Sequence, residues 1–147
     1  MSASVESPFS DEIPELLQRH LGHLAGSAIP PDTIRERVYR SVMGKKALVD
    51  TGFPKSQQRY SGILIPLHGV QGTIVGYQYR PDHPRTGANE KVIKYENPAG
   101  SSIRLDVPPR CCKHLNDPSI PIWFTEGVKK EDALVSHGAC VVRIVRI

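Results

Sequence analysis

The end of the sequence, residues 122–147, constrains the fold more than any other part, and it reads IWFTEGVKKEDALVSHGACVVRIVRI. The run at 120–125 is almost continuously apolar, which is typical of a strand that is buried on both faces. Glu126 and Gly127 follow it, and then come a helical pattern that ends at Gly138 and a second β-rich run. Two strands joined by a helix in this way predict a parallel pair with a right-handed connection.

The rest of the chain extends this pattern to an α+β fold. We expect residues 1–10 to be a flexible tail and residues 11–147 to form a single domain. Within it, 11–52 has the leucine spacing of short helices, 60–110 has the β-branched and aromatic residues of a sheet, and 120–147 is the strand–helix–strand unit. The predicted fold therefore has N-terminal helices, a central, mainly antiparallel sheet with a β-hairpin, and the C-terminal unit.

Short motifs place the boundaries of these elements. Ser10 or Asp11 can cap the first helix, and Pro31 stands in the first turn of the second. The turn HGVQG separates the two arms of the hairpin. Shorter strands are predicted in KVIKYENP (91–98) and in SIRLDVPPR (102–110).

The composition limits the location and the partners of the chain. No apolar run is long enough to cross a bilayer and no signal-peptide pattern is present, so we expect a cytoplasmic protein without membrane contact. The formal net charge of +4 favours an anionic partner such as nucleic acid as much as it favours an ordinary basic surface. His20 and His23 are interpreted as polar surface residues, because their spacing alone is not a metal site.

The three cysteines do not predict a disulfide framework, since their number is odd and two of them are adjacent. The motif CCKH brings Cys111, Cys112 and His114 close together in the sequence, and Cys140 could complete a zinc site. The spacing, however, does not match the usual C-x2-C pairs. We therefore predict reduced, partly buried thiols and no zinc.

Two segments taken together resemble a known family. The hairpin GILIPLHGVQGTIVGYQYRP (62–81) with KVIKYENP comes first, and TEGVKKEDAL (125–134) follows. This order resembles the catalytic core of bacterial DnaG-type primases, in which an Ile-x-x-Pro hairpin, an Arg and a Lys-Tyr-x-Asn strand precede a Toprim domain that opens with strand–Glu–Gly–helix. The second segment resembles still more closely a Toprim-like domain of unknown function in phage and plasmid replication proteins. The resemblance covers roughly residues 12–142.

The resemblance implies a role in phosphate chemistry for the start of the C-terminal helix. Because Mg²⁺ takes oxygen ligands, a carboxylate at a strand end suits it, and the family implies that Glu126 is an acid/base or magnesium-binding residue. The alternative is a carboxylate that only favours the helix dipole. Gly127 would let a phosphate approach the helix N-terminus. Lys129 and Lys130 oppose the dipole there, which a bound phosphate would offset; the alternative is a solvated face beside the two acids that follow.

The family also implies a set of phosphate contacts in the central sheet. Four residues match its basic and amide positions in order, and they would contact template or nucleotide phosphates: Arg80, Lys91, Lys94 and Asn97. Tyrosines alternate with them at positions 77, 79 and 95. Exposed tyrosines could stack on bases, and packing within the sheet is the alternative.

The sequence departs from the Toprim pattern in places that concern catalysis. Lys130 stands where an Asp is usual, and no Asp-x-Asp pair occurs anywhere in the chain. Arg143 and Arg146 stand where the family would continue with apolar and Gly residues. A single Glu is a poor magnesium site, because most of the ligand charge must then come from the substrate. Autonomous catalysis is therefore not expected.

Three hypotheses for the function follow. The first is a nucleic-acid-binding, primase-like module of a mobile genetic element, which would bind a single strand or a primer–template through Arg80, Lys91, Lys94, Lys129 and Lys130. The second is a stand-alone interaction or inhibitor protein, such as a phage anti-defence protein, which would use its final strand as an exposed edge for a protein partner. The third is a magnesium-dependent enzyme completed in trans or by dimerisation.

Overall fold

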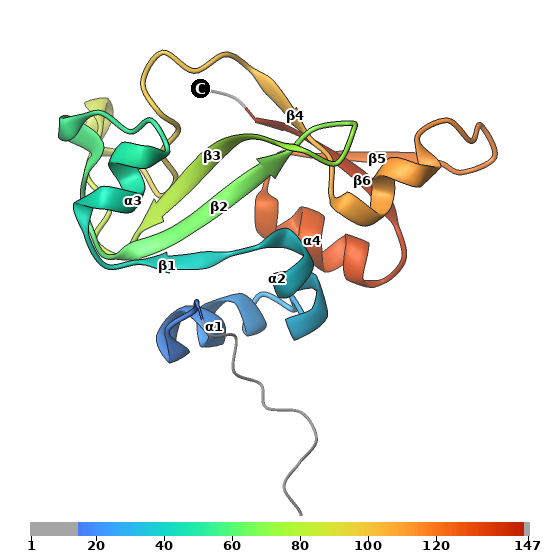
Figure 1. The fold of residues 1–147 in the computed structure, drawn as a ribbon, viewed down its shortest axis with the longest axis horizontal. Helices are drawn as coiled ribbons and strands as arrows, with labels where there is room; N and C mark the ends of the chain where they lie inside the picture. The colour runs from blue at the N-terminus through green and yellow to red at the C-terminus, as the bar shows by residue number, and fades with distance from the viewer. Residues whose placement is uncertain (1–14, 146–147) are drawn as a thin grey trace, which may run out of the picture.

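A computed structural model describes residues 15–145 of the chain (Figure 1). Its helices within these residues are α1 (Gln18–Ala25), α2 (Pro31–Arg37), α3 (Lys45–Asp50) and α4 (Val128–Ser136), with short 3-10 segments η1 (Lys55–Gln57), η2 (Ala88–Glu90) and η3 (Pro109–His114). The predicted tail at 1–10 and the predicted caps Ser10 and Asp11 lie outside the described residues. None of the helices in 15–145 is long and apolar enough to span a membrane.

The first sheet is antiparallel and is built on the predicted hairpin. Its strands are β1 (Arg40–Val42), β2 (Gly62–His68) and β3 (Ile74–Pro81), in the order β1-β2-β3. The hairpin prediction is confirmed, with Leu64 opposite Tyr79 in the register of β2 and β3. The strand β1 was not expected within the helical part; it forms because Val38 adopts a left-handed conformation that ends α2 and turns the chain toward β2.

The second sheet contains the predicted parallel pair. Its strands are β4 (Arg104–Asp106), β5 (Ile122–Thr125) and β6 (Cys140–Val145), in the order β4-β6-β5. β5 and β6 are parallel and joined by α4, whereas β4 is antiparallel to β6. The α+β fold class is thereby confirmed.

Two expectations about this sheet are wrong. The final strand is not an exposed edge, because β6 lies between β4 and β5. Nor is β5 buried on both faces: it is an edge strand within the described residues, and Trp123 and Phe124 are 60% and 67% exposed. Successive side chains of a strand lie on opposite faces, so both faces of β5 are open to solvent.

The segment KVIKYENP does not form the predicted strand. It makes only isolated bridges, one between Thr86 and Val92 and one between Tyr79 and Glu96. In the second bridge the backbone N–H of each residue donates to the carbonyl of the other, at 2.7 and 2.8 Å. The backbone of the segment is therefore attached to β3 at Glu96, two residues beyond Lys94, and the side chain of Gln78 in β3 donates to Asn97 Oδ1 at 3.3 Å.

Apolar side chains cover both faces of the first sheet. On one face, α1, α2 and the start of α4 pack on β2 through Leu21, Leu24, Ile34, Val128, Ile63 and Ile65. On the other face, α3 packs on the sheet through Leu48, Phe53, Leu64 and Tyr79. A third cluster lies between η3, α4 and β6 and contains Cys111 and Cys140, so the prediction of partly buried thiols is confirmed.

A buried histidine attaches α1 to the first sheet. His20 is 3% exposed, and its ring nitrogens form hydrogen bonds with Ser41 Oγ at 2.6 Å and with Asp82 Oδ1 at 2.8 Å. Although burial opposes ionisation, hydrogen bonds from Ser61, Arg19 and His20 lower the pKa of Asp82 to about 2. The interpretation of His20 as a surface residue is wrong, because this face of α1 packs on the sheet.

The close contact between β2 and Tyr79 predicts a sharp difference between two glycines. A Cβ on Gly62 would lie 2.6 Å from Tyr79 Oη and would also collide with the Arg80 carbonyl, whereas a Cβ on Gly22 in α1 would meet nothing within 4 Å. We expect Gly62→Ala to lower the free energy of unfolding by about 1–3 kcal/mol. Gly22→Ala should raise it by about 0.5–1 kcal/mol through helix propensity. Urea denaturation measures both, and equal effects would contradict this packing.

Candidate nucleic-acid interface

Four basic side chains from separate elements meet beside the first sheet. They are Arg80 at the end of β3, Lys94, Lys129 in the first turn of α4, and His23 in α1, and they are called the basic cluster below. Burial, followed by the charges of Arg80 and Lys94, lowers the pKa of Lys129. Burial and the charges of Arg80 and Lys129 likewise lower the pKa of His23. The structure thus brings together three of the residues predicted to bind phosphate.

The packing of the fold explains why these residues meet. Val128 belongs to the same apolar cluster as Leu21 and Leu24 of α1, so the start of α4 lies against α1. There Lys129 Nζ lies 3.4 Å from Nε2 of His23. The bridge between Tyr79 and Glu96 holds the neighbouring segment beside the end of β3.

Arg80 is placed to donate to a ligand. Its guanidinium carbon lies 6.0 Å from the ring centroid of Tyr95, a cation–π arrangement. Tyr95 itself packs against the core beneath α1, and burial raises the pKa of its hydroxyl. The Nε of Arg80 is buried and has no hydrogen-bond partner within the described residues. An unpartnered guanidinium N–H that is buried in this way costs free energy.

The cluster carries more positive charge than its surroundings neutralise. Within residues 15–145, no ion pair joins a carboxylate to Arg80, Lys94 or Lys129. Burial is the larger cause of the lowered pKa values of Lys129 and His23, and the like charges of the neighbouring cations add to it. An anion bound here would reverse that effect.

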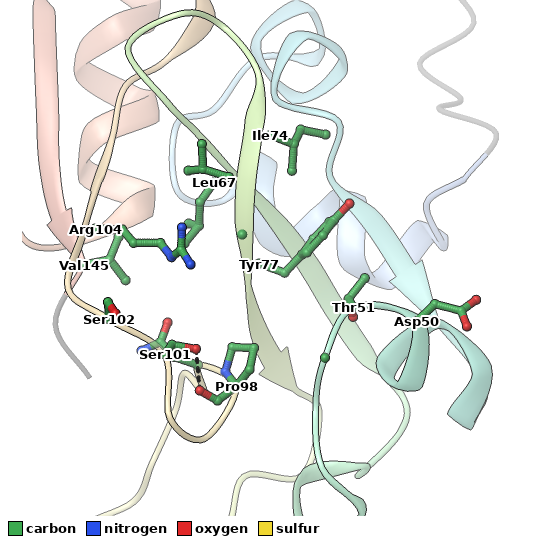
Figure 2. Close-up of a pocket in the computed structure, with 14 residues that line it drawn as sticks. Asp50, Thr51, Leu67, Ile74, Tyr77, Pro98, Ser101, Ser102, Arg104 and Val145 are labelled. Atoms are coloured by element: carbon green, nitrogen blue, oxygen red, sulfur yellow. Dashed lines mark hydrogen bonds between the residues drawn. The ribbon is translucent and has the colours of Figure 1, made fainter.

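Three other predicted contacts lie outside the basic cluster. Lys91 is exposed, and its carbonyl accepts a hydrogen bond of 2.8 Å from Gly87 N–H that closes a turn. Lys130 is exposed on α4, whereas the neighbouring Lys129 is partly buried. Asn97 lines a pocket between β3 and the loop that leads to β4 (Figure 2). For these residues a role in binding stays a prediction.

Of the three tyrosines that could stack on bases or pack within the sheet, one belongs to the core and two are partly accessible. Tyr79 is fully buried and packs edge-to-face on Phe53 at 5.9 Å between ring centroids, so it belongs to the core. Tyr95 is partly buried beside Arg80, and Tyr77 is partly buried in the wall of the pocket. Only the last two can offer a ring face to a base.

Glu126 and Gly127 form the link between β5 and α4. Glu126 is exposed at the strand end, as predicted, and Gly127 is the N-cap of α4. The dihedral angles of Gly127, φ −105° and ψ 128°, are open to any residue, and a Cβ there would meet only Lys130, at 3.9 Å. In residues 15–145 no three His, Cys, Asp or Glu side chains are grouped to hold a metal ion. The described residues alone do not fit a protein-held magnesium site, and magnesium at Glu126 stays a prediction.

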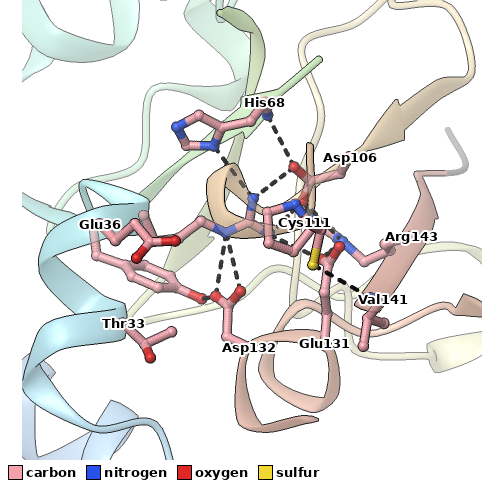
Figure 3. Close-up of polar contacts among 12 residues, drawn as sticks. Thr33, Glu36, His68, Asp106, Cys111, Glu131, Asp132, Val141 and Arg143 are labelled. Carbon is pink, nitrogen blue, oxygen red and sulfur yellow. Dashed lines mark hydrogen bonds and ion pairs between the residues drawn. The ribbon is translucent and has the colours of Figure 1, made fainter. Parts of the chain in front are cut away.

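Next to the basic cluster lies a buried ionic network that the sequence did not predict (Figure 3). Arg37 of α2 donates to both carboxylate oxygens of Asp106 at 2.7 and 2.6 Å and to Glu131 at 2.8 Å. Arg143 of β6 donates to the same two acids at 2.6 and 3.0 Å. Arg37 also contacts Asp132 at 3.2 Å. All five side chains are at most 2% exposed.

The sequence interpretation of two acids in this network is wrong. Glu131 and Asp132 follow Lys129 and Lys130 in the helix and look like a solvated face, but they are buried against the arginines. Three carboxyl groups meet only two guanidinium groups, so one carboxyl should be protonated. Burial, together with the nearby acids, raises the pKa of Glu131 to about 9 despite the attraction of both arginines.

The hydrogen bonds leave one oxygen of Glu131 and one of Asp132 buried without a partner in the described residues, and burial raises the pKa of Asp132 as well. Glu131 Oε2 accepts from Arg37 and Arg143, and the pKa of Glu131, raised to about 9, places the proton there. By contrast, although burial opposes ionisation, Arg37 and Arg143 lower the pKa of Asp106 to about 2. With Glu131 neutral, two cations face the carboxylates of Asp106 and Asp132, and the network is balanced.

Comparison with known proteins supports the predicted fold. A family model described as "Domain of unknown function (DUF3854)" matches residues 113–147, the segment that contains β5, α4 and β6. No protein of curated function matches the sequence.

Solved structures of primase cores are similar to this chain at 16% identity. They include the zinc-binding and RNA polymerase domains of the Aquifex aeolicus primase, with a TM-score of 0.65 over 86% of this chain and 36% of that one. For the DnaG catalytic core the TM-score is 0.61, over 91% and 49%. For the DnaG primase catalytic domain bound to ssDNA it is 0.63, over 94% and 51%.

The chain thus has a primase-like fold, which confirms that part of the resemblance. It spans between 36% and 51% of the length of these primase structures. At this level of identity the likeness concerns the fold, and the chemistry of the residues has to be argued from their own geometry.

The protonated state of Glu131 predicts how stability depends on pH. A pKa raised from 4.5 to about 9 means that the folded protein holds one more proton than the unfolded chain between these values. Its contribution to stability is therefore full below pH 4.5 and is lost as pH rises toward 9, by up to about 1.4 kcal/mol per pH unit. Glu131→Gln resembles the protonated form and lacks this loss.

We therefore expect Glu131→Gln to gain stability relative to the native protein between pH 5 and pH 8, measured by urea denaturation at each pH. Glu90→Gln, on an exposed turn, is the matched control and should follow the native protein. If the difference in the free energy of unfolding between Glu131→Gln and the native protein did not change with pH, Glu131 would be ionised in the folded protein.

Proposed function

We propose that the chain is a nucleic-acid-binding, primase-like module of a mobile genetic element, and that it acts in the cytoplasm of its host without autonomous catalysis. The observation that carries the binding proposal is the basic cluster, in which Arg80, Lys94 and Lys129 converge and form no ion pair with a carboxylate within residues 15–145. The assignment to a phage or plasmid rests on the resemblance of the TEGVKKEDAL run. A primase core solved with ssDNA supports a single strand as the ligand, and a primer–template is the alternative.

The geometry of the cluster suits a phosphate backbone. Arg80 can donate through a planar guanidinium, while Lys94 and Lys129 act as point charges around it. Tyr95 lies beneath Arg80 and offers an aromatic surface beside the charges, a combination that sequence-independent single-strand binding uses. Lys91 and Lys130 are exposed and could extend the contact along the strand.

Catalysis is not part of the proposal, for two reasons. The sequence has no Asp-x-Asp pair, and the described residues contain no group of three metal-ligating side chains. If the chain nevertheless synthesised or cleaved a primer with magnesium and nucleotides, and Glu126→Gln abolished that activity, an enzyme would be the correct interpretation.

The salt dependence of binding tests the proposal. Each phosphate contact to a single strand contributes about 0.7 to the slope of log affinity against log salt concentration. We expect the 147-residue chain to bind an oligothymidylate in a salt-dependent way, and Arg80→Gln or Lys129→Gln to lower the slope by about 0.7 each. Fluorescence anisotropy measures the affinities.

The control is Lys45→Gln, since Lys45 is exposed on α3 and lies outside the cluster. It should leave both affinity and slope close to those of the native protein. Affinity that is absent at low salt, or that does not respond to salt, would disprove nucleic-acid binding through this cluster.

The lowered pKa of His23 predicts that binding is linked to a proton. Burial and the charges of Arg80, Lys129 and His20 lower this pKa below 6.5, against the effect of Asp82. A phosphate would raise it, so the complex takes up a proton as pH falls, and affinity should rise about three- to tenfold between pH 7 and pH 5. Oligothymidylate is suitable because its bases do not titrate there.

In His23→Gln this rise should be much smaller, because Gln has no proton to gain. The comparison uses affinities at constant ionic strength, so that only protonation changes. If the native protein and His23→Gln showed the same pH dependence, His23 would lie outside the binding surface.

A further inference from the structure

A second candidate site is the pocket that Asn97 lines (Figure 2). It lies beside Gly76 of β3, four residues before Arg80 in the sequence. Its volume is about 540 Å³, within the range of small-molecule sites. The walls come from the end of α3, from β3, from the loop before β4 and from Arg104. We propose that this pocket binds a nucleotide, with its phosphate on Arg104 and its base against Tyr77.

Arg104 provides the anion-binding group. It is exposed at the start of β4, and none of the ion pairs or hydrogen bonds within residues 15–145 uses its guanidinium. Its side chain crosses β3 at Gly76, where a Cβ would lie 3.5 Å from Cδ and Nε of the arginine. That distance is an ordinary van der Waals contact, so the aliphatic part of Arg104 lies directly against the strand at Gly76.

Tyr77 provides the aromatic surface. It packs in part against the cluster beneath α3, and it also lines the pocket, so one side of the ring is supported while another is accessible. In Figure 2, Arg104 and Tyr77 approach the pocket from opposite sides, with Ser101 and Pro98 below them. A ring and a cation on opposite walls match the base and the phosphate of one nucleotide.

The charge of the lining also favours an anion. The carboxylate in the lining, that of Asp50, forms an ion pair with Lys46 at 2.6 Å. The hydroxyl of Ser101 donates to the Pro98 carbonyl, which leaves its oxygen able to accept from a base or a sugar. Among the described residues that line the pocket, the uncompensated charge is therefore the positive charge of Arg104.

The pocket is built before a ligand arrives. Gln57 is 6% exposed, and its amide N–H donates to the Asn97 carbonyl at 2.8 Å. Its side-chain oxygen accepts from Ala99 N–H at 2.9 Å. These bonds fix the loop that forms one wall, so binding does not require that wall to become ordered.

The pocket and the basic cluster share one strand. Gly76 and Arg80 lie on the same face of β3, about 13 Å apart at the rise of a strand. A bound nucleotide could therefore be a free one or one member of a strand held at the basic cluster. The chemistry is the same in both cases, and the inference does not depend on the function proposed above.

The test follows backbone amide shifts of the ¹⁵N-labelled 147-residue chain by NMR. We expect adenosine monophosphate to shift the amides of Gly76, Tyr77 and Ser101 in a saturable way, and to bind at least about tenfold more tightly than inorganic phosphate. Arg104→Gln should weaken this binding about tenfold or more, and Tyr77→Leu should abolish the preference over phosphate. Arg35→Gln, at an exposed position of α2, is the control and should bind as the native chain does.

A second titration with oligothymidylate separates the two sources. Shifts at the pocket with the oligonucleotide alone assign the site to a nucleotide of the strand, and shifts with the free nucleotide assign it to a separate ligand. No shift at the pocket amides with either probe, or equal affinity for adenosine monophosphate and phosphate, overturns the proposal. Arg80→Gln tests the proposed strand binding separately. If the native chain does not bind the strand, shifts at the pocket with adenosine monophosphate still support the pocket proposal.

Discussion

Asp106 accepts from both Arg37 and Arg143, and through Arg37 the buried network links α2, which packs on the first sheet, to the second sheet. These residues come from α2, β6 and β4, and Glu131 of α4 completes the contact. Two buried guanidinium groups would be very costly without carboxylates, so every element that supplies one is held in place. The backbone N–H of His68 also donates to Asp106, which attaches the end of β2 to the same centre. Because the network fixes α4, it also fixes where Lys129 lies relative to Arg80.

The network and the basic cluster show two uses of the same residue types. In the network each arginine has carboxylate partners, and the pKa of Asp106 is lowered as a result. In the cluster the cations have one another as neighbours, and burial together with the charges of Arg80 and Lys94 lowers the pKa of Lys129. The first arrangement is complete in itself, whereas the second gains from an anion. This contrast in local charge balance is the reason for assigning binding to Arg80 and Lys129 and a structural role to Arg37 and Arg143.

The hairpin and the parallel pair could be predicted because their signals, turn residues and apolar runs, are each contained in a short stretch of sequence. Arg80, Lys94 and Lys129 lie close together in the fold, and their role as phosphate contacts stays a prediction. The network could not be found this way, since Arg37 and Glu131 are far apart in the sequence and buried charges look like surface charges. The burial of β5 was predicted from its apolar run, but burial depends on which strands lie beside it, and within 15–145 β5 has a neighbour on one side only.

The open edge at β5 also carries the single tryptophan of the sequence, Trp123. Tryptophan fluorescence is usually interpreted as a measure of core burial, but here the indole is largely exposed, on a strand that has a neighbour on one side only within residues 15–145. Its emission should therefore be nearly that of a water-exposed indole while the core is intact. A blue shift in this protein would mean that something has come to rest on the sheet, and the intrinsic fluorescence reports contact at β5 rather than folding.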